Sequence, residues 1–298
     1  MNVRFIMIII MIAAMLTTGC GSDETDDDNL QSSTEEAVAK RAAFPQVPAN
    51  DVIAADDFSN LQINDITKPI YDKHTIWERQ EAGLSMALPE INEYTGGKVA
   101  YLTFDDGPDD KNTNMILDIL KNYGIHATFY VCGNMVETYP QVLRRIYEEG
   151  HAIGNHSYNH VYKDLYPSTD NFLKQISDTD EIIKSVIGVR PLIIRTPGGR
   201  VGMWTPDYEP LMTACGYVEH DWNVSVEDAT GRELTPQEMI HIVDEQTNRP
   251  IKDDAAIILM HSNKGKENTA AALPGIIKVL VDKGYRFGVI TPMTPQPW

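Results

Sequence analysis

The sequence predicts an α/β fold whose strands form one parallel sheet, either closed into a barrel or open and doubly wound. From residue 98 onward, short runs rich in β-branched and aromatic residues alternate with helical stretches. Glycines follow several of the helical stretches, where a helix C-terminus favours a left-handed residue. Seven such alternations in succession are typical of repeated βα units and a parallel sheet.

The predicted strands are short apolar runs, namely Val99–Phe104, Ala127–Val131, Ala152–Gly154, Leu192–Arg195, Tyr217–Trp222, Ala255–Met260 and Arg286–Ile290. The helical stretches between them include Met115–Tyr123, Gln141–Glu149, Asn171–Ile187 and Pro236–Asn248. Thr235 and Glu238 have the spacing of a capping box at the start of the last of these, with Pro236 at the first helical position. These signals fix where that helix begins.

Polar residues follow the predicted strands at their carboxyl ends, and they are Asp105, Asp106, His156, His160, Arg195, Asp228 and His261. One polar residue at a strand end is usually a turn residue or a helix cap. Five strands or their following loops that place titratable groups at the same edge are hard to explain in that way. In α/β barrels the catalytic groups come from this edge, so the sequence predicts a site there.

The residue types at this edge suit metal-assisted hydrolysis. His156 and His160 stand four apart and reach one metal ion if the segment curls as a turn or helix. Of Asp105 and Asp106, one would complete a two-histidine, one-carboxylate site, and the other would be a general base. The residues alone do not decide which does which. His261 is the candidate proton donor to the leaving group.

Arg195 and the glycines after it suggest groups that bind charge. A guanidinium can hold a carboxylate in a bidentate grip. In Thr196-Pro197-Gly198-Gly199 the glycines let backbone N–H groups approach a developing oxyanion. The same edge therefore supplies a metal site, a base, an acid and an oxyanion donor.

Four segments together resemble the motifs of the NodB-homology polysaccharide deacetylases (carbohydrate esterase family 4), and they are Thr103–Pro108, His156–His160, Arg195–Gly199 and Leu259–Ser262. They follow the family's order and span roughly residues 98–292. The resemblance implies a distorted (β/α) barrel of about seven βα units. It also implies removal of N- or O-acetyl groups from polysaccharides with a divalent metal, commonly Zn²⁺, with Co²⁺, Mn²⁺ and Ni²⁺ as alternatives.

Residue roles also follow from the resemblance. It implies that Asp105 is the catalytic base and His261 the catalytic acid. The implied metal ligands are Asp106, His156 and His160. Arg195 would orient the base, and the implied substrate contacts are the Gly198 amide, Leu259 at the acetyl methyl group, and Trp222.

One motif departs from the family pattern. The family usually has an Asp-Trp pair in its fourth motif. The Asp supports the catalytic histidine, and the Trp forms one wall of the acetate pocket. Here Asp228 keeps the acidic position, but Ala229 stands where the Trp would be. The supporting role therefore remains expected, and the substrate pocket is expected to lack one wall.

The N-terminal region has the features of an export signal followed by a spacer. Residues 1–20 contain Arg4, a short apolar run and a Gly directly before Cys20. This pattern resembles a lipoprotein signal peptide in which Cys20 is the lipidated residue. Leu16 stands one place further from Cys20 than in the usual pattern. An ordinary cleaved secretion signal or a short anchor is the alternative. Residues 21–58 carry ten acids against two bases and are expected to be a flexible acidic tether. Residues 59–97 are expected to pack on the barrel domain of residues 98–298.

The composition excludes some classes of protein. Apolar residues make up 42% of the 298 residues, which excludes a wholly disordered chain. The net charge of −18 argues against binding nucleic acid or anionic lipid through a general electrostatic field. Cys132 and Cys215 are expected near opposite ends of the domain and therefore unpaired. The remaining histidines are expected to be structural or exposed, and they are His74, His126, His151, His220 and His241.

These observations predict an exported, monomeric hydrolase on the outer face of a bacterial membrane, or a secreted one. Its expected substrate is a cell-wall polysaccharide, foremost the N-acetylglucosamine of peptidoglycan. Chitin-like oligomers, another exopolysaccharide and acetylated xylan remain alternatives. Two rivals come from other classes, a catalytically silent glycan-binding wall protein and a non-haem iron oxygenase, which also uses two histidines and one carboxylate.

Overall fold

The structure is a computed structural model that describes Phe58, Leu61 and residues 65–298. The predicted signal peptide, Cys20 and nearly all of the predicted tether lie outside the described residues. Within the described residues, no helix is both long and apolar enough to span a membrane.

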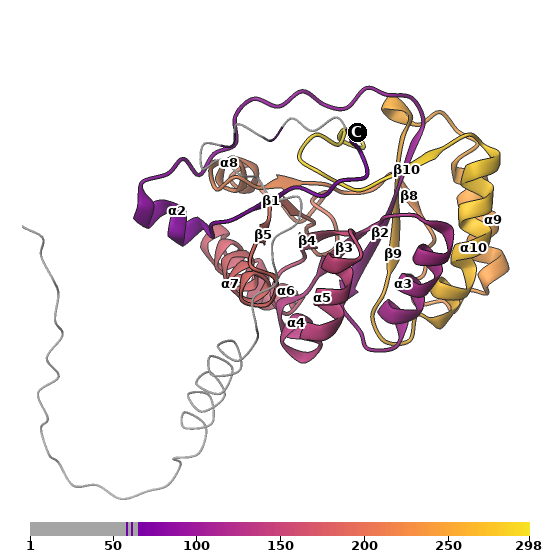
Figure 1. Ribbon diagram of the computed structural model, residues 1–298, viewed down its shortest axis with the longest axis horizontal. Helices are drawn as coiled ribbons and strands as arrows, with labels where there is room; N and C mark the ends of the chain where they lie inside the picture. The colour runs from indigo at the N-terminus through magenta and orange to yellow at the C-terminus, as the bar shows by residue number, and fades with distance from the viewer. Residues whose placement is uncertain (1–57, 59–60, 62–64) are drawn as a thin grey trace, which may run out of the picture. The chain divides into compact units, whose positions relative to one another are not determined.

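A curved sheet of eight parallel strands forms the centre of the molecule, confirming the predicted α/β fold (Figure 1). Its strands are β2 (Val99–Gly107), β3 (Thr128–Val131), β4 (Ala152–Asn155), β6 (Ile193–Ile194), β7 (Val218–Glu219), β8 (Val224–Ser225), β9 (Ala255–His261) and β10 (Arg286–Gly288). The spatial order is β7-β6-β4-β3-β2-β9-β8. Strand β10 pairs with the first residues of β2, and β3 pairs with the last ones.

The distortion of the barrel lies between β7 and β8. The sequence predicts one strand over Tyr217–Trp222, but β7 covers only Val218–Glu219 of that range, and β8, which was not predicted, begins beyond it at Val224. The backbone N–H of His220 still donates to Ile194 of β6, and that of Asn223 already donates to Ile257 of β9. Both strands run parallel to their neighbours, so one extended stretch leaves one side of the sheet and joins the other. Asp221 and Trp222 therefore lie where the sheet is not joined by strand pairing.

Helices cover the outside of the sheet. They are α3 (Asn112–Tyr123), α4 (Gly133–Thr138), α5 (Pro140–Glu148), α6 (Tyr162–Leu165), α7 (Thr169–Ile187), α8 (Tyr208–Ala214), α9 (Pro236–Gln246) and α10 (Glu267–Asp282), with a short 3₁₀ turn η1 (Lys252–Asp254). Helices α3, α9 and α10 group together, and α4, α5 and α7 form another group (Figure 1). The predicted capping box at Thr235 and Glu238 is present, so α9 begins where the sequence places it.

The main hydrophobic core lies between the sheet and these helices. The rings of Phe104 on β2 and Phe129 on β3 stack with centroids 5.1 Å apart. Buried aliphatic residues of α3, α7 and α10 pack around them. Burying each such side chain contributes roughly 1.5–3 kcal/mol, so the core fixes the positions of the strand ends that carry the polar residues.

The segment before the barrel contacts the domain at its edge. Strand β1 (Tyr71–Asp72) pairs antiparallel with β5 (Arg190–Pro191), and helix α2 (Ile76–Ala82) follows it. The buried Asp72 carboxylate accepts hydrogen bonds from Arg79 and Arg190 at 2.6 to 3.2 Å. This segment is therefore held to the domain by charge as well as by apolar contacts.

Candidate metal and catalytic site

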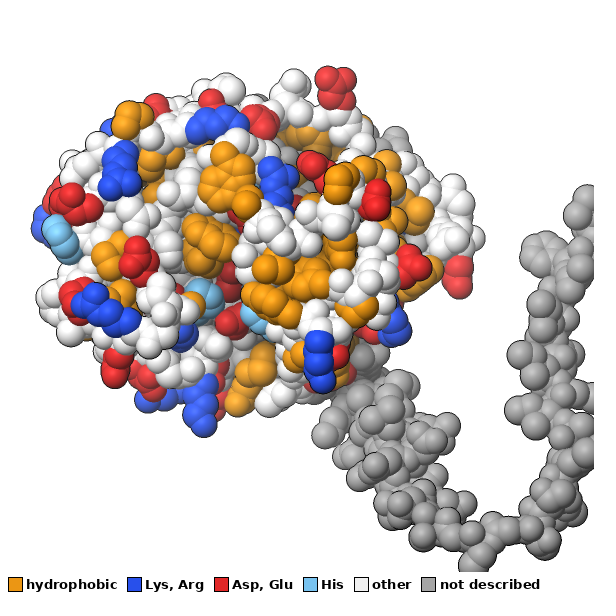
Figure 2. Space-filling model, turned by 180° about the vertical axis from the view of Figure 1, so that it is seen from behind, with side chains coloured by type: hydrophobic (Ala, Val, Ile, Leu, Met, Phe, Trp, Pro, Cys, Tyr) orange, Lys and Arg blue, Asp and Glu red, His pale blue; other side chains and the backbone are white. Residues whose placement is uncertain are grey.

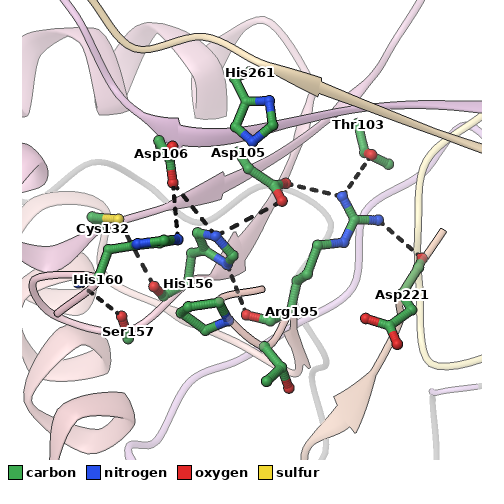
Figure 3. A network of polar contacts seen from close by, with 12 residues as sticks. Thr103, Asp105, Asp106, Cys132, His156, Ser157, His160, Arg195, Asp221 and His261 are labelled. Carbon is green, nitrogen blue, oxygen red and sulfur yellow. Dashed lines mark hydrogen bonds and ion pairs between the residues drawn. The ribbon is translucent and has the colours of Figure 1, made fainter. Parts of the chain in front are cut away.

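Strand β2 ends in two adjacent acids whose side chains point in different directions (Figure 3). Asp105 is buried and its Oδ1 accepts a hydrogen bond from Arg195 Nη1 at 2.9 Å. Asp106 has a left-handed backbone with φ of 68°, and its Oδ1 faces the two histidines. The backbone turn thus separates one carboxylate from the other at the same strand end.

His156 follows β4 and is held by its neighbour across the sheet. Its Nδ1–H donates to the carbonyl oxygen of Arg195 at 2.7 Å, which leaves Nε2 as the nitrogen with a free lone pair. That Nε2 lies 3.5 Å from Asp106 Oδ1. Burial lowers the pKa of His156 to about 3, so the ring is the neutral form that binds metal.

His160 reaches the same place from a turn, and no helix is needed. Ser157 and His160 both have positive φ, at 71° and 57°, and the His160 amide donates to Ser157 Oγ at 3.2 Å. His160 Nε2 lies 3.6 Å from Asp106 Oδ1. Asn155 supports the turn by accepting from the Ser157 amide at 3.0 Å.

The three side chains fit one divalent cation. One ligand atom from each of Asp106, His156 and His160 lies within 4.8 Å of the other two. Asp106 Oδ1 is buried and has no hydrogen-bond partner among the described residues. A buried carboxylate oxygen between two imidazole nitrogens is costly unless a cation satisfies it. Two nitrogens and one oxygen with open positions suit Zn²⁺ in a catalytic setting.

Asp105 is held beside this group by a buried guanidinium. Arg195 Nη1 also donates to Thr103 Oγ1 at 2.7 Å, and its Nε and Nη2 donate to the carbonyl oxygens of His220 and Asp221. Burial raises the pKa of Asp105, although the Arg195 and His261 charges act in the opposite direction. A base whose pKa is raised toward neutrality is better matched to proton abstraction near pH 7.

His261 ends β9 opposite Asp105 and is paired with Asp228. Its Nδ1 lies 2.7 Å from Asp228 Oδ1, and its backbone amide donates to Asp228 Oδ2 at 3.0 Å. Burial opposes protonation of His261, but the hydrogen bond to Asp228 and the nearby carboxylates outweigh it and raise its pKa. With Nδ1 engaged, Nε2 is the nitrogen that can give a proton.

The predicted substrate contacts surround these groups at different depths. Gly198 is exposed with φ of 83°, and a side chain there would collide with the Tyr162 hydroxyl. Leu259 is on β9 and 8% exposed. Trp222 is half-buried, and its ring lies 5.9 Å from the Arg195 guanidinium carbon and would be 3.1 Å from a Cβ atom at Gly199. One face of the molecule shows acidic and histidine side chains in a hollow flanked by hydrophobic ones (Figure 2).

Comparison with known proteins adds independent information. The sequence profile of the polysaccharide deacetylase family matches residues 92–219, which include the first three motifs. A peptidoglycan-N-acetylglucosamine deacetylase of Bacillus cereus is 34% identical over 204 residues, covering 67% of this chain and 69% of that protein. The chain belongs to the polysaccharide deacetylase family.

Other members of the deacetylase family support the fold, and one of them is about twice as long as the region that this chain matches. The structure of a Streptococcus mutans carbohydrate esterase family 4 enzyme matches with a TM-score of 0.62 and 33% identity, covering 66% of this chain and 87% of that one. The peptidoglycan-N-acetylmuramic acid deacetylase PdaC of Bacillus subtilis is 35% identical over 235 residues, 77% of this chain. This chain covers 47% of PdaC, so it spans about half of that relative's length.

Several residues that support this candidate site were not predicted. Thr103 binds Arg195, the Tyr130 ring lies 4.2 Å from the Arg195 guanidinium carbon, and Thr269 donates to Asp228 at 2.7 Å. Thr103 stands two residues before Asp105, and the period of a strand could have placed both on one face. Tyr130 and Thr269 look like ordinary strand and helix residues in the sequence.

Cys132 and His220 lie beside the site, because the Cys132 thiol donates to the carbonyl oxygen of His156 at 3.8 Å and the carbonyl oxygen of His220 accepts from Arg195 Nε (Figure 3). Cys132 and Cys215 are buried and unpaired, confirming the expectation. His241 lies on α9 beside Asp244 and Glu245, in a second group whose atoms could hold a metal ion. That group is largely exposed and Asp244 already pairs with Lys283 at 2.7 Å. Nothing further points to a ligand there.

Proposed function

We propose that this protein is a metal-dependent hydrolase that removes N-acetyl groups from a cell-wall polysaccharide, with the N-acetylglucosamine of peptidoglycan as substrate. The observation that carries the proposal is the convergence of Asp106, His156 and His160 beside a buried acid and a paired histidine. A divalent ion held by these three residues would polarise the acetyl carbonyl and lower the pKa of a water molecule.

The remaining groups have complementary tasks in such a hydrolysis. Asp105 would take the proton from the attacking water, since Arg195 holds one carboxylate oxygen and leaves Oδ2 toward His156 Nε2 at 3.7 Å. His261 would give a proton to the amide nitrogen as the C–N bond breaks, producing acetate and a free amine. The Gly198 amide would donate to the oxyanion, a contribution of about 10²–10³ in rate.

The cell wall is the substrate source that the relatives support. The Bacillus cereus relative is named for N-acetylglucosamine of peptidoglycan, and PdaC is named for N-acetylmuramic acid. We propose N-acetylglucosamine first, and the PdaC likeness makes N-acetylmuramic acid the second candidate. Both sugars offer the same acetamido group to the site.

We also propose that the chain is exported and works as a monomer at the outer face of the membrane. The apolar run before Cys20 and the acidic segment after it support a lipid anchor followed by a spacer. Two acyl chains give stable anchoring that one chain does not. Incorporation of labelled palmitate into the wild-type chain, lost in Cys20→Ala, would test the anchor, and Cys215→Ala is the matched control.

Mass spectrometry of digested peptidoglycan tests the activity and identifies the sugar. Wall treated with the metal-loaded protein is expected to yield muropeptides that lack one acetyl group on N-acetylglucosamine. Asp105→Asn should abolish the change, and Asp110→Asn, an exposed neighbour, should not. Acetyl loss on N-acetylmuramic acid alone would replace the first candidate with the second. Fully acetylated wall under folded, metal-loaded protein would reject both.

The two rival classes make different predictions. A silent glycan-binding protein would bind wall glycan without releasing acetate. An iron oxygenase would consume oxygen, and the acid–base pair of Asp105 and His261 gives no reason for that reaction. Metal analysis, together with oxygen uptake measured at an electrode, distinguishes an iron oxygenase from a hydrolase.

A further inference from the structure

The turn over residues 156–160, which carries both histidines of the candidate metal site, needs support from outside itself. It lies outside any helix or strand, and Ser157 and His160 both have left-handed backbones. That conformation is uncommon in residues other than glycine, and it persists only where surrounding contacts hold it. The His160 side chain is 35% exposed, so burial alone does not fix it. The position of its Nε2 therefore depends on hydrogen bonds to the turn.

Gln175 on helix α7 provides two of these hydrogen bonds. Its Oε1 accepts from the Tyr158 amide at 3.2 Å and from the Asn159 amide at 3.4 Å. Tyr158 and Asn159 are the two residues directly before His160 in the chain. Backbone amides that lose their water partners need other acceptors. One side-chain oxygen on α7 therefore satisfies two consecutive amides of the turn.

Asn155, the residue before His156, is oriented by Asp180, which also lies on α7. Both the Asn155 and the Asp180 side chains are fully buried. Asn155 Nδ2 donates to Asp180 Oδ1 and to the carbonyl oxygen of Ile176, both at 2.8 Å. Its Oδ1 accepts from the Ser157 amide at 3.0 Å. The opposite orientation of the Asn155 amide would place its oxygen against two acceptors, so Asp180 determines which end faces Ser157.

Consecutive hydrogen bonds connect α7 to the second histidine. Asp180 orients Asn155, and Asn155 holds the backbone of Ser157. Ser157 Oγ in turn accepts from the His160 amide at 3.2 Å (Figure 3). On the other side, the first amides of α4 donate to two carbonyl oxygens of the turn at 3.1 and 3.0 Å. Helices α4 and α7 contact each other, so both sides of the turn are held by elements that the core fixes.

Asp180 has a close structural counterpart in Asp72, because both acids face Arg190. Arg190 Nη1 lies 3.6 Å from Asp180 Oδ2, and Arg190 Nη2 lies 3.0 Å from Asp72 Oδ2. All three side chains are buried. Asp180 also contacts Asn155, whereas Asp72 lies in the segment before the barrel and contacts Arg79. The two acids make similar ion pairs, but Asp180 is the one that is joined to the turn.

We infer that Gln175 and Asp180 are positioning residues of the metal site, which set the place of His160 Nε2 through the backbone of the turn. In the described part of the chain, neither side chain bonds to those of Asp106, His156 and His160. They therefore act at one remove from the proposed ligands. The inference rests on the proposed function for its choice of a metal at this site.

The test measures the dissociation constant of Co²⁺ by calorimetry in variants of the full chain. Gln175→Met keeps the length of the side chain and removes the acceptor, and Gln175→Glu keeps an acceptor. Asp180→Leu likewise removes the acceptor that faces Asn155, and Asp180→Asn keeps one. Asp72→Leu is the matched control, since it removes the other acid beside Arg190. Urea denaturation of each variant measures the free energy of unfolding separately.

Gln175→Met and Asp180→Leu are expected to weaken Co²⁺ binding by about 3- to 10-fold, because hydrogen bonds to the turn are lost. Gln175→Glu and Asp180→Asn should stay within about twofold of the wild type, since each retains an acceptor. Asp72→Leu should lower the free energy of unfolding as Asp180→Leu does, and leave Co²⁺ binding unchanged. This difference separates positioning of the metal site from a general loss of stability.

Wild-type Co²⁺ affinity in Gln175→Met and Asp180→Leu would overturn the inference. Equal weakening by Asp72→Leu and Asp180→Leu would also overturn it, because the effect would then follow stability. If Asp180→Leu does not fold, the two Gln175 variants decide. A wild type that binds no Co²⁺ would reject the metal site and the inference together. Co²⁺ binding with the expected pattern but no release of acetate would reject the proposed hydrolysis and keep the inference.

Discussion

Asp228 holds His261 at two points, with its Oδ1 2.7 Å from the imidazole Nδ1 and its Oδ2 accepting from the backbone amide at 3.0 Å. This double contact orients the ring and determines which nitrogen faces the site. It also places a negative charge beside the imidazole, which favours the protonated form needed for an acid.

Asp228→Asn should therefore shift the pH dependence of the reaction. Since the carboxylate helps to raise the pKa of His261, its removal lowers that pKa. His261 would then lose its proton at a lower pH, and the alkaline limb of kcat/KM should move to lower pH. We expect kcat to fall by roughly 10- to 100-fold, less than for complete loss of the general acid at about 10²–10⁴.

Thr269→Val is the control for that measurement. It removes the Thr269 hydroxyl that donates to Asp228 Oδ2 and leaves the contact with His261 Nδ1. The alkaline limb should stay nearly in place. An Asp228→Asn enzyme with an unmoved alkaline limb would show that another group is the acid.

His160→Ala should reduce metal affinity with little change in folding, because His160 lies on a partly exposed turn. Loss of one of the three proposed metal ligands is expected to lower metal content after dialysis and activity together. Plasma emission analysis of the purified protein measures the metal. His241→Ala removes the histidine of the second group on α9 and should leave metal content unchanged. The opposite pattern would place the metal on α9.

Arg195→Met should destabilise the fold, because it leaves the buried Asp105 carboxylate without its cation. Removing one partner of a buried ion pair costs about 3–5 kcal/mol. Urea denaturation would measure this loss in the free energy of unfolding. Arg232→Met, which removes an exposed ion pair with Glu238, should change it by less than about 1 kcal/mol. Equal effects of the two substitutions would contradict the role assigned to Arg195.

We expect Asp72 to make part of the free energy of unfolding depend on pH in the acid range. Burial opposes ionisation of Asp72, but Arg79 and Arg190 outweigh it and lower its pKa below 3.8. Its stabilising contribution is then fully present above about pH 4 and is lost as pH falls through the folded-state pKa. The unfolding free energies of wild type and Asp72→Asn should differ most at neutral pH and converge in acid. Asp118→Asn, at an exposed pair with Arg145, should show no comparable difference.

The sequence predicted the placement of the site better than its internal geometry. Alternation of strands and helices put Asp105, His156, Arg195 and His261 at one edge of the sheet, and the structure brings their side chains together. The residues alone could not choose which adjacent acid faces the histidines. That choice depends on the left-handed backbone of Asp106, with φ of 68°, which composition and period do not reveal.

Other features of the structure could not be predicted, because they depend on contacts between residues that are far apart in the sequence. The predicted strand Tyr217–Trp222 is shortened to β7, and β8 follows it as a separate strand, because the chain changes partner from β6 to β9 near Asp221. The ring of Trp204 stacks on that of Tyr208, and both contact Phe172, which lies more than 30 residues earlier in the sequence.

The most direct test of metal-dependent deacetylation measures acetate and free amine released from N-acetylglucosamine oligomers, before and after metal removal. We expect equal amounts of both products, loss of both on chelation, and recovery when Zn²⁺ is returned. We also expect that recovery fails in His156→Ala. Folded, Zn²⁺-loaded protein that releases neither product, or that releases both at the same rate after chelation, would contradict metal-dependent deacetylation at this site.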